Sequence, residues 1–393
     1  MVVKNLNFVG AGRKDGSDKA GVVIHDCEDV EVDNIDVSGF LLSGLQLSGV
    51  HDGRITNVYA HENGSAGITA GASEQKGWCK NLYIAYCVAE NNPGNPRNLT
   101  NHSGNGIVVG RTNGAVIEFC EAFNNGWDMP RKGNGPVGIW AWDAADITIQ
   151  FCIAHDNKSP GDDGGGFDLD GGIRDSVLQY NLSYNNDGPG YFLCQYPSAP
   201  RFKNAIVRYN ISLNDGIKNN RRSAIDIFAA NDGMSDCEIY NNTVYNSKGA
   251  AVGFGGIDVP NVVFRNNIFV CAGDIITGEA KRGRFENNIY WPAEGCSLTF
   301  DGHETFEAWV AATGQEKVDG KVVGRYVDPK LIITDDAKIT DPTNLTELRA
   351  YKLKAGSPCI GAGLSIENNG GRDFWGNKLP KKCKPHIGAF QKP

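Results

Sequence analysis

The sequence lacks the features that would assign it to several common classes of protein. No apolar stretch is long enough to cross a membrane as a helix. It contains no GxxxxGK phosphate-binding loop, no HExxH zinc motif and no GxSxG nucleophile motif. The formal net charge is −8, whereas a surface that binds nucleic acid needs an excess of Lys and Arg. We therefore expect neither a nucleic-acid partner nor a membrane span.

Cysteine is too sparse for a disulfide scaffold, with 11 residues in a chain of 393, and no CxxC pair points to zinc or redox chemistry. Cys87, Cys120 and Cys152 occupy equivalent positions in three similar segments, where they would stack inside a core as small apolar side chains. The sequence leaves open a disulfide between Cys359 and Cys383.

Methionine and long runs of helix-forming residues are also scarce, while glycine is abundant. The chain has only 3 Met and as many as 50 Gly. This composition favours strands and turns over a helical bundle, so an all-β protein is expected.

Two lines of repeats run through the first three quarters of the chain and predict its fold. The first line begins with Gly or Ala and then alternates: GLQLSG at 44, GITAGA at 67, GIVVGR at 106, GIWAWD at 138, GFDLDG at 166, GYFLCQ at 190, AIDIFA at 224 and AVGFGG at 251. The second line includes IAYCVAENN, IEFCEAFNN, IQFCIAHDN, LQYNLSYNN and VRYNISLND. The spacing of about 23 to 39 residues indicates one solenoid coil per repeat. The Asn residues at the ends of the second line should form a hydrogen-bonded ladder, at positions 91, 124, 157, 185 and 214.

This repeat frame resembles the right-handed parallel β-helix proteins of the pectin-lyase-like superfamily, many of which are carbohydrate-active enzymes. The resemblance covers about residues 1–295 and implies a parallel β-helix domain there. A β-propeller is the alternative fold, but the shortest repeats disfavour it. The segment GDD at 161–163 is similar to part of the acidic signature of polygalacturonase-type hydrolases, but the companion NTD, HG and RIK elements are absent, so no catalytic residue is carried over.

Residues 296–393 lose the repeat and should form a C-terminal cap and a short packing tail. Phe306, Trp309 and Val310 stand at helical spacing, and Gly314 follows as a C-cap. We expect this helix to cover the open end of the solenoid, where strand edges would otherwise be exposed.

The alternation in the first line predicts which side chains leave the core. One outward column should read Gln46, Thr69, Val108, Trp140, Asp168, Phe192, Asp226 and Gly253, and the next Ser48, Gly71, Gly110, Trp142, Asp170, Cys194, Phe228 and Gly255. Aromatic rings and carboxylates on one exterior patch suggest a groove for sugars. Asp168 and Asp170 would lie about 6.5 to 7 Å apart, and Asp168 and Asp226 roughly 9.6 Å, both compatible with a glycosidase pair.

These residues define the predicted site. The catalytic candidates are Asp168, Asp170 and Asp226, and the substrate-binding candidates are His102, Trp127, Arg131, Trp140, Trp142, Asp143, Gln195 and Arg222. No cofactor is expected. The alternative for the acidic cluster is calcium, held with the help of Asp162 and Asp163.

We therefore expect a glycan-degrading enzyme that acts on an oligo- or polysaccharide, a glycoside hydrolase in the first instance. A calcium-dependent lyase acting on a uronate-containing glycan and a non-catalytic glycan-binding solenoid are the alternatives. No signal peptide is visible, yet residues 2–9 already have the character of a strand. We expect a secreted or periplasmic monomer whose leader has been removed.

Overall fold

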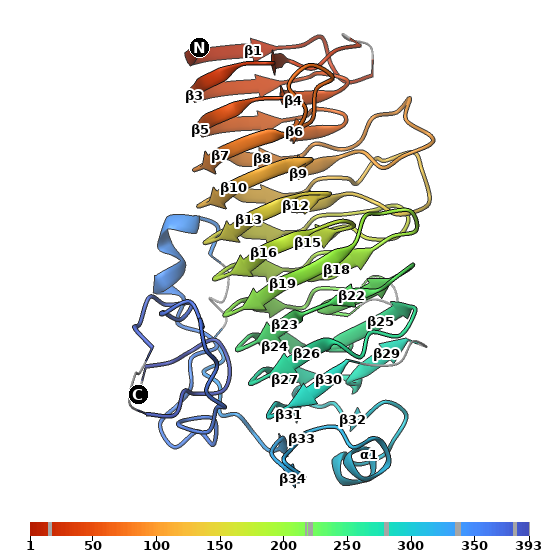
Figure 1. The fold of residues 1–393 in the computed structure, drawn as a ribbon, viewed down its shortest axis with the longest axis vertical. Helices are drawn as coiled ribbons and strands as arrows, with labels where there is room; N and C mark the ends of the chain where they lie inside the picture. Colours follow the sequence, from red (N-terminus) through yellow and green to blue (C-terminus); the bar gives the residue numbers. More distant parts are fainter. Residues whose placement is uncertain are drawn as a thin grey trace.

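The computed structural model describes residues 1–14, 18–216, 218, 223–278, 283–334, 339–379 and 383–392. Its chain winds into a stack of coils whose strands pair with the strands above and below them (Figure 1). All pairings between named strands within the stack are parallel. The predicted all-β solenoid is confirmed.

A 10-stranded sheet forms one wall of the solenoid and takes one strand from each coil. Its strands are β2 (Val22–His25), β4 (Ser43–Ser48), β6 (Ala66–Gly71), β9 (Asn105–Gly110), β12 (Val137–Trp142), β15 (Gly165–Asp170), β18 (Tyr191–Gln195), β21 (Ile225–Ala229), β25 (Val252–Gly256) and β29 (Ile276–Gly278).

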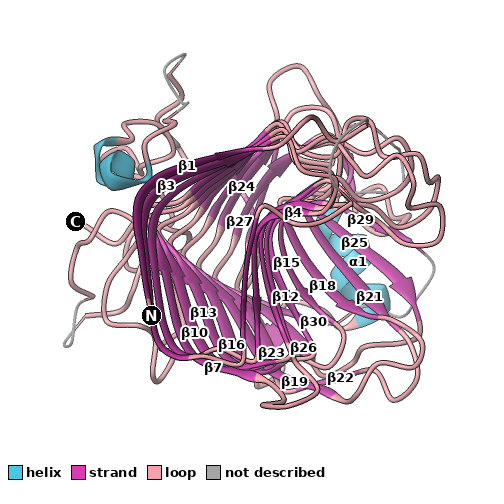
Figure 2. Cartoon of the chain, turned by 90° about the horizontal axis from the view of Figure 1, so that it is seen from above, coloured by secondary structure: helices cyan, strands magenta, loops and turns pink. Residues whose placement is uncertain are grey.

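A 21-stranded sheet forms the other walls. It begins with the long strands β1 (Val2–Val9), β3 (Glu28–Ser38) and β5 (His51–His61). One stack then contains β7 (Cys79–Ala85), β10 (Thr112–Glu118), β13 (Ala145–Gln150), β16 (Arg174–Gln179), β19 (Phe202–Arg208), β22 (Met234–Ser235), β23 (Cys237–Tyr240), β26 (Val262–Arg265) and β30 (Arg284–Glu286). The other contains β8 (Val88–Glu90), β11 (Glu121–Phe123), β14 (Ile153–His155), β17 (Leu182–Tyr184), β20 (Ile211–Leu213), β24 (Thr243–Asn246), β27 (Ile268–Cys271), β31 (Ile289–Pro292) and β35 (Arg325–Tyr326). Seen along the axis, the walls enclose one core (Figure 2).

The alternation of each repeat fills this core as predicted. The inward residues Ile139, Phe167 and Tyr191 stand in register on neighbouring strands and are almost fully buried. Cys87, Cys120 and Cys152 are buried as well, in agreement with their predicted role as small core residues. All eleven cysteines are free. A disulfide between Cys359 and Cys383 is therefore wrong, since the first thiol is buried and the second exposed.

Two internal ladders of side-chain amides tie the coils together. The first contains Asn63, Asn92, Asn125, Asn157, Asn186 and Asp215, and each Asn side chain donates to the next member over 2.8 to 3.2 Å. The second contains Asn181, Asn210, Asn242, Asn267, Asn288 and Glu316. Of the predicted ladder positions only Asn157 belongs to the buried ladder. At the other four, the predicted Asn adopts positive φ at the turn, and the ladder residue is the one after it, because the turn points the first side chain outward.

The C-terminal segment closes one end of the stack and follows its side. Helix α1 (Phe306–Thr313) ends at Gly314, which has φ 74°, as predicted from the sequence. Its Trp309 is buried against Phe285, Tyr290 and Phe300 at the last coils. Two short strand pairs accompany the cap: β28 (Gly273–Asp274) of the last coils pairs with β32 (Leu298–Thr299), and β33 (Lys317–Val318) pairs with β34 (Lys321–Val322).

Beyond the cap, the tail contains the 3₁₀ helix η1 (Pro342–Glu347) and packs on the wall made by β14, β17, β20 and β27. It lies away from the 10-stranded sheet (Figures 1 and 2). The domain boundary between residues 295 and 296 stays a prediction, and β35 still adds to the large sheet beyond it. Within the described residues, no helix has the length and apolarity that a membrane crossing requires.

Candidate active site

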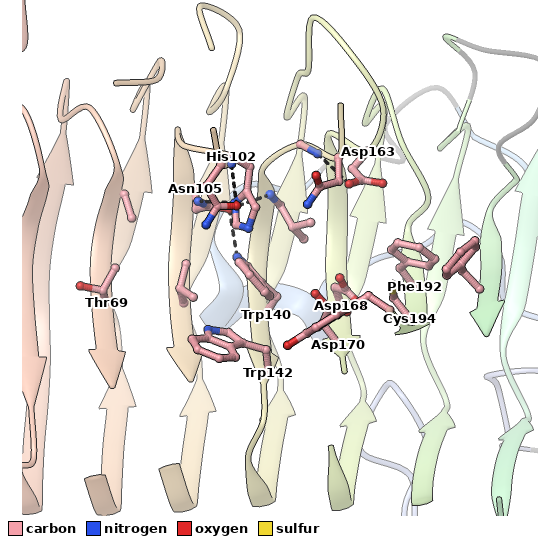
Figure 3. A pocket seen from close by; sticks show the side chains of 18 of the residues that line it. Thr69, His102, Asn105, Trp140, Trp142, Asp163, Asp168, Asp170, Phe192 and Cys194 are labelled. Carbon is pink, nitrogen blue, oxygen red and sulfur yellow. Dashed lines mark hydrogen bonds between the residues drawn. The ribbon is translucent and has the colours of Figure 1, made fainter. Parts of the chain in front are cut away.

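A cavity of about 700 Å³ lies on the outer face of the 10-stranded sheet. Its floor comes from β6, β9, β12, β15, β18 and β21, and its rim comes from the loops between the coils. The lining residues are Ser65, Ala66, Thr69, Asn101, His102, Asn105, Val108, Asn134, Gly135, Val137, Trp140, Trp142, Asp163, Asp168, Asp170, Phe192, Cys194, Tyr196, Pro197 and Phe228. Most of these side chains are drawn in Figure 3.

The strand register builds the floor of the cavity from the predicted columns. Trp140 stands beside Asp168, which stands beside Phe192. Trp142 stands beside Asp170 in the second column. The alternation of the repeats therefore predicted correctly that aromatic rings and carboxylates share one exterior patch.

Asp168 and Asp170 occupy the centre of the floor. Both side chains leave the same face of β15 and lie between the tryptophans of β12 and the side chains of β18 (Figure 3). Asp168 is only 3 % exposed, and Asp170 is half-buried. The two carboxyl groups thus stand in a sheltered site with apolar walls on both sides.

The surroundings of Asp170 favour its protonated form. Burial raises the pKa of this carboxyl to about 7, against the lowering effect of hydrogen bonds from the Gly171 backbone N–H, at 2.7 Å, and from the Cys194 thiol. The negative charge of Asp163 adds to the increase. Asp170 can therefore hold a proton at near-neutral pH.

The tryptophans form the wall on the N-terminal side of the carboxyl pair. Trp140 is buried among Val108, Val137 and Ala66, and its indole N–H donates to Asn105 Oδ1 at 3.1 Å. Trp142 is more exposed and lies over Gly110, whose missing side chain makes room for the indole. Phe192 and Phe228 line the opposite side.

Comparisons with known proteins agree with this architecture. Residues 97–231, which carry most of the cavity, match the family described as "Right handed beta helix region". The solenoid is a right-handed parallel β-helix. The fold that the resemblance implied is confirmed.

Solved structures similar to this β-helix share little sequence with it. XylC in complex with xylose aligns at 12 % identity over 95 % of this chain and 67 % of its own, with a TM-score of 0.47. The pectate lyase Pel9A aligns at 15 % identity over 93 % of this chain and 73 % of its own, with a TM-score of 0.44. A tailspike protein of E. coli bacteriophage HK620 with a bound hexasaccharide aligns at 12 % identity, 75 % coverage of this chain and a TM-score of 0.48. This chain spans half of that tailspike's length. A search of curated proteins finds no match in sequence.

Five of the predicted site residues line the cavity of the β-helix together: His102, Trp140, Trp142, Asp168 and Asp170. Asp163, the predicted calcium ligand, also lines it, and its Oδ2 accepts the Gly135 backbone N–H at 2.7 Å. Its neighbour Asp162 is exposed.

The other predicted residues that the structure describes lie outside the lining. Asp226 is buried in the same column and lies against Gly253. Trp127 is 48 % exposed and donates to Asn91 Oδ1, at 2.9 Å. Arg131 donates to the Asn134 backbone oxygen at 2.7 Å.

Two more candidates, Asp143 and Gln195, make their contacts at the turns that follow β12 and β18. The Asp143 carboxylate lies 3.5 Å from Arg111 Nε. Gln195 is 1 % exposed, accepts from the Gly172 N–H and donates to the Pro200 oxygen at 2.8 Å. Arg222 lies outside the described residues. The roles of these residues remain predictions.

Sequence reasoning did not select Asn105, which proves to be a central hydrogen-bonding residue of the cavity. Asn105 is the first residue of β9, in register with Ala66 of β6. It precedes the glycine with which its repeat begins, so the alternation within the repeat does not predict whether its side chain points inward or outward. The sequence offers one hint of its role: Asn105, in SGNGIVVG, is polar, whereas the equivalent residue of the neighbouring coil is Val137.

Proposed function

We propose that this β-helix is a glycoside hydrolase in which Asp170 is the general acid and Asp168 is the general base or nucleophile. The observation that carries the proposal is a pair of carboxyl groups on one face of a strand, at the bottom of an aromatic-walled cavity where burial raises the pKa of Asp170. A pair of carboxyl groups in different protonation states is what glycosidic bond cleavage needs.

The steps follow from this arrangement. The Asp170 proton passes to the glycosidic oxygen as its bond to the anomeric carbon breaks. Asp168 either removes a proton from the water that attacks that carbon, or attacks it directly before water releases the sugar. The strand spacing of about 6.5 to 7 Å between the two residues lies between the separations of the retaining and the inverting class. The anomeric configuration of the product decides which role Asp168 has.

The walls of the cavity support a sugar as the ligand. The C–H faces of a sugar ring are apolar and match the flat faces of Trp142 and Phe228, while its hydroxyl groups need polar partners such as Asn134 and Asn101. We further propose that the substrate is an oligo- or polysaccharide outside the cytoplasm and that the enzyme is a secreted or periplasmic monomer.

The proposal is tested on a panel of plant, algal and host glycans, by measuring new reducing ends and ultraviolet absorbance together. Hydrolysis gives new reducing ends without absorbance. An unsaturated, absorbing product would instead identify a lyase and would overturn the assigned roles. Binding of glycans with no cleavage of any of them would also overturn it.

The pH dependence of the reaction should report the Asp170 proton. Because a general acid works only when protonated, kcat/KM is expected to fall as pH rises through about 7, the pKa of Asp170. Replacing Cys194 by Ala removes a hydrogen bond that lowers this pKa, so the fall should move to higher pH. A rate that rises from pH 6 to pH 8 would contradict the assignment of Asp170.

The contribution of Trp142 can be tested without changing it. In Gly110→Ala, the new Cβ would collide with the Trp142 indole, so the indole must move. We expect KM to rise about tenfold with little change in the melting temperature, because stacking on the ring is lost. Gly71→Ala is the matched control, one coil earlier in the same column, where nothing lies within 4 Å of an added Cβ. Equal KM values in the two variants would show that Trp142 does not contact the substrate.

A further inference from the structure

The Asn105 side chain has a fixed orientation at the N-terminal end of the cavity. Its Oδ1 accepts from the Val137 backbone N–H and from the Trp140 indole N–H, each at 3.1 Å. Both partners can only donate, so the amide oxygen must face them. Its Nδ2 therefore faces the Ser65 backbone oxygen and His102 Nδ1, each at 3.3 Å.

This orientation selects one tautomer of His102. An amide NH₂ only donates, so His102 Nδ1 accepts and the ring proton resides on Nε2. Burial, together with the positive charge of Arg131, lowers the pKa of His102 to about 4. The ring is thus neutral at working pH, with a single N–H donor at Nε2.

The Nε2–H donor has no partner of its own in the described part of the chain, where the hydrogen bond of the His102 ring is the one to Asn105. The ring lines the cavity and lies 5.2 Å from the Trp140 ring, between centroids (Figure 3). His102 is half-buried and its ring lines the cavity, so a ligand oxygen can reach the Nε2–H and accept its hydrogen bond.

The chemistry of the surroundings favours a hydroxyl oxygen over a carboxylate as that acceptor. The acidic side chains among the described lining residues are those of Asp163, Asp168 and Asp170. A neutral imidazole adds no positive charge to offset the repulsion between these acidic groups and an anion. Arg131 acts on the pKa of His102, but its guanidinium donates to Asn134 and does not line the cavity. A hydroxyl group can accept from Nε2–H without this repulsion.

We propose that the half of the cavity bounded by His102, Asn105, Trp140 and Trp142 is a subsite for one sugar ring, which presents a hydroxyl oxygen to His102 Nε2–H. Asn105 acts as a positioning residue, because it sets the tautomer of His102 and also holds the Trp140 indole. The inference rests on the proposed function only in that a sugar occupies the cavity. It names the group of the sugar that is recognised and predicts that uronic acids are poor ligands here.

Binding of methyl pyranosides measures this subsite without any turnover. The panel contains the methyl glycosides of glucose, galactose, mannose and xylose, and the methyl glucuronide and galacturonide, with tryptophan fluorescence and saturation-transfer NMR as readouts. At least one neutral glycoside should bind, and its affinity should exceed that of the matching uronide by about tenfold or more. Tighter binding of the uronides, or no binding of any neutral glycoside, would overturn the inference.

Variants assign the hydrogen bond to His102. His102→Ala should weaken binding of the neutral glycoside about tenfold, while His102→Gln, which keeps an N–H donor, should recover most of the loss. Side-chain ¹⁵N shifts should show the Nε2–H tautomer from pH 6 to pH 8, and Asn105→Ala should introduce the Nδ1–H form. Unchanged affinity in His102→Ala, or an Nδ1–H tautomer in the wild type, would refute the inference.

The failures of the two proposals are distinguishable. Methyl glycosides that bind through His102, with no glycan ever cleaved, would overturn the hydrolase and leave the subsite intact. If a glycan is hydrolysed and its KM is the same in His102→Ala as in the wild type, the subsite is overturned and the hydrolase assignment stands.

Discussion

The Asp168→Asn variant is expected to lose activity by about 10³- to 10⁴-fold in kcat while its melting temperature changes little. An asparagine has nearly the same shape as the aspartate, but it can neither remove a proton from water nor attack the anomeric carbon. Asp168 stands in the outer column of β15, while the core is packed by Phe167 and Leu169 on the opposite face. The substitution therefore changes the chemistry of the site more than the fold. Undiminished activity would rule out Asp168 as a catalytic residue.

The companion variant Asp170→Asn separates the two roles. Loss of the general acid should slow natural glycosides by about 10²- to 10⁴-fold. Aryl glycosides with a good leaving group need no proton, so they should be much less affected. The folded protein holds the Asp170 proton up to about pH 7, whereas the unfolded chain releases it near pH 3.8, so this carboxyl makes the fold less stable as pH rises between these two values, and the full loss is present above pH 7. Asp170→Asn should thus melt at the same or a higher temperature than the wild type at pH 8. An equal loss of activity on natural glycosides and on aryl glycosides would contradict the assignment of Asp170 as the general acid.

The second large effect is expected in the buried amide ladder. Asn157 Oδ1 accepts from the backbone N–H and Nδ2 of Asn125, and its Nδ2 donates to the Ala122 oxygen and to Asn186 Oδ1. Asn157→Ala leaves several of these buried groups without partners, at about 1 to 3 kcal/mol each. We expect a loss of about 2 to 5 kcal/mol in the free energy of unfolding, measured with urea.

Asn124→Gly is the matched control for the ladder. Asn124 is exposed and has φ 51°, a conformation that glycine adopts without strain. Its loss should change the free energy of unfolding by less than about 1 kcal/mol. If the two variants were equally stable, the ladder would not be a main source of coil-to-coil cohesion.

The sequence predicted the fold and the floor of the cavity because both depend on periodicity. The spacing of GIWAWD, GFDLDG and GYFLCQ is enough to align Trp140, Asp168 and Phe192 on neighbouring strands, and the strand register confirms this alignment. The same rule failed where the backbone leaves the strand. Alternation does not specify which residue of an Asn-Asn pair, or of the Asn214-Asp215 pair, turns inward, so the predicted ladder stands one residue too early at four positions.

The rest of the site depends on contacts that no period encodes. The orientation of His102 follows from a hydrogen bond to Asn105, which in turn is fixed by Trp140 one coil later. Trp127 and Arg131 belong to loops whose length suggested a role in the site, but loop length does not determine where a side chain points. The guanidinium carbon of Arg13 lies 5.9 Å from the centre of the Trp127 ring, and Trp127 does not line the cavity.

Cleavage in ¹⁸O-labelled water tests the central claim most directly. For a glycan that the wild-type protein cleaves, hydrolysis predicts one labelled oxygen at the anomeric carbon of each new reducing end, no ultraviolet absorbance, and no product from Asp168→Asn. An unlabelled or unsaturated product, or the same product from Asp168→Asn, would contradict a hydrolase built on the carboxyl pair of β15.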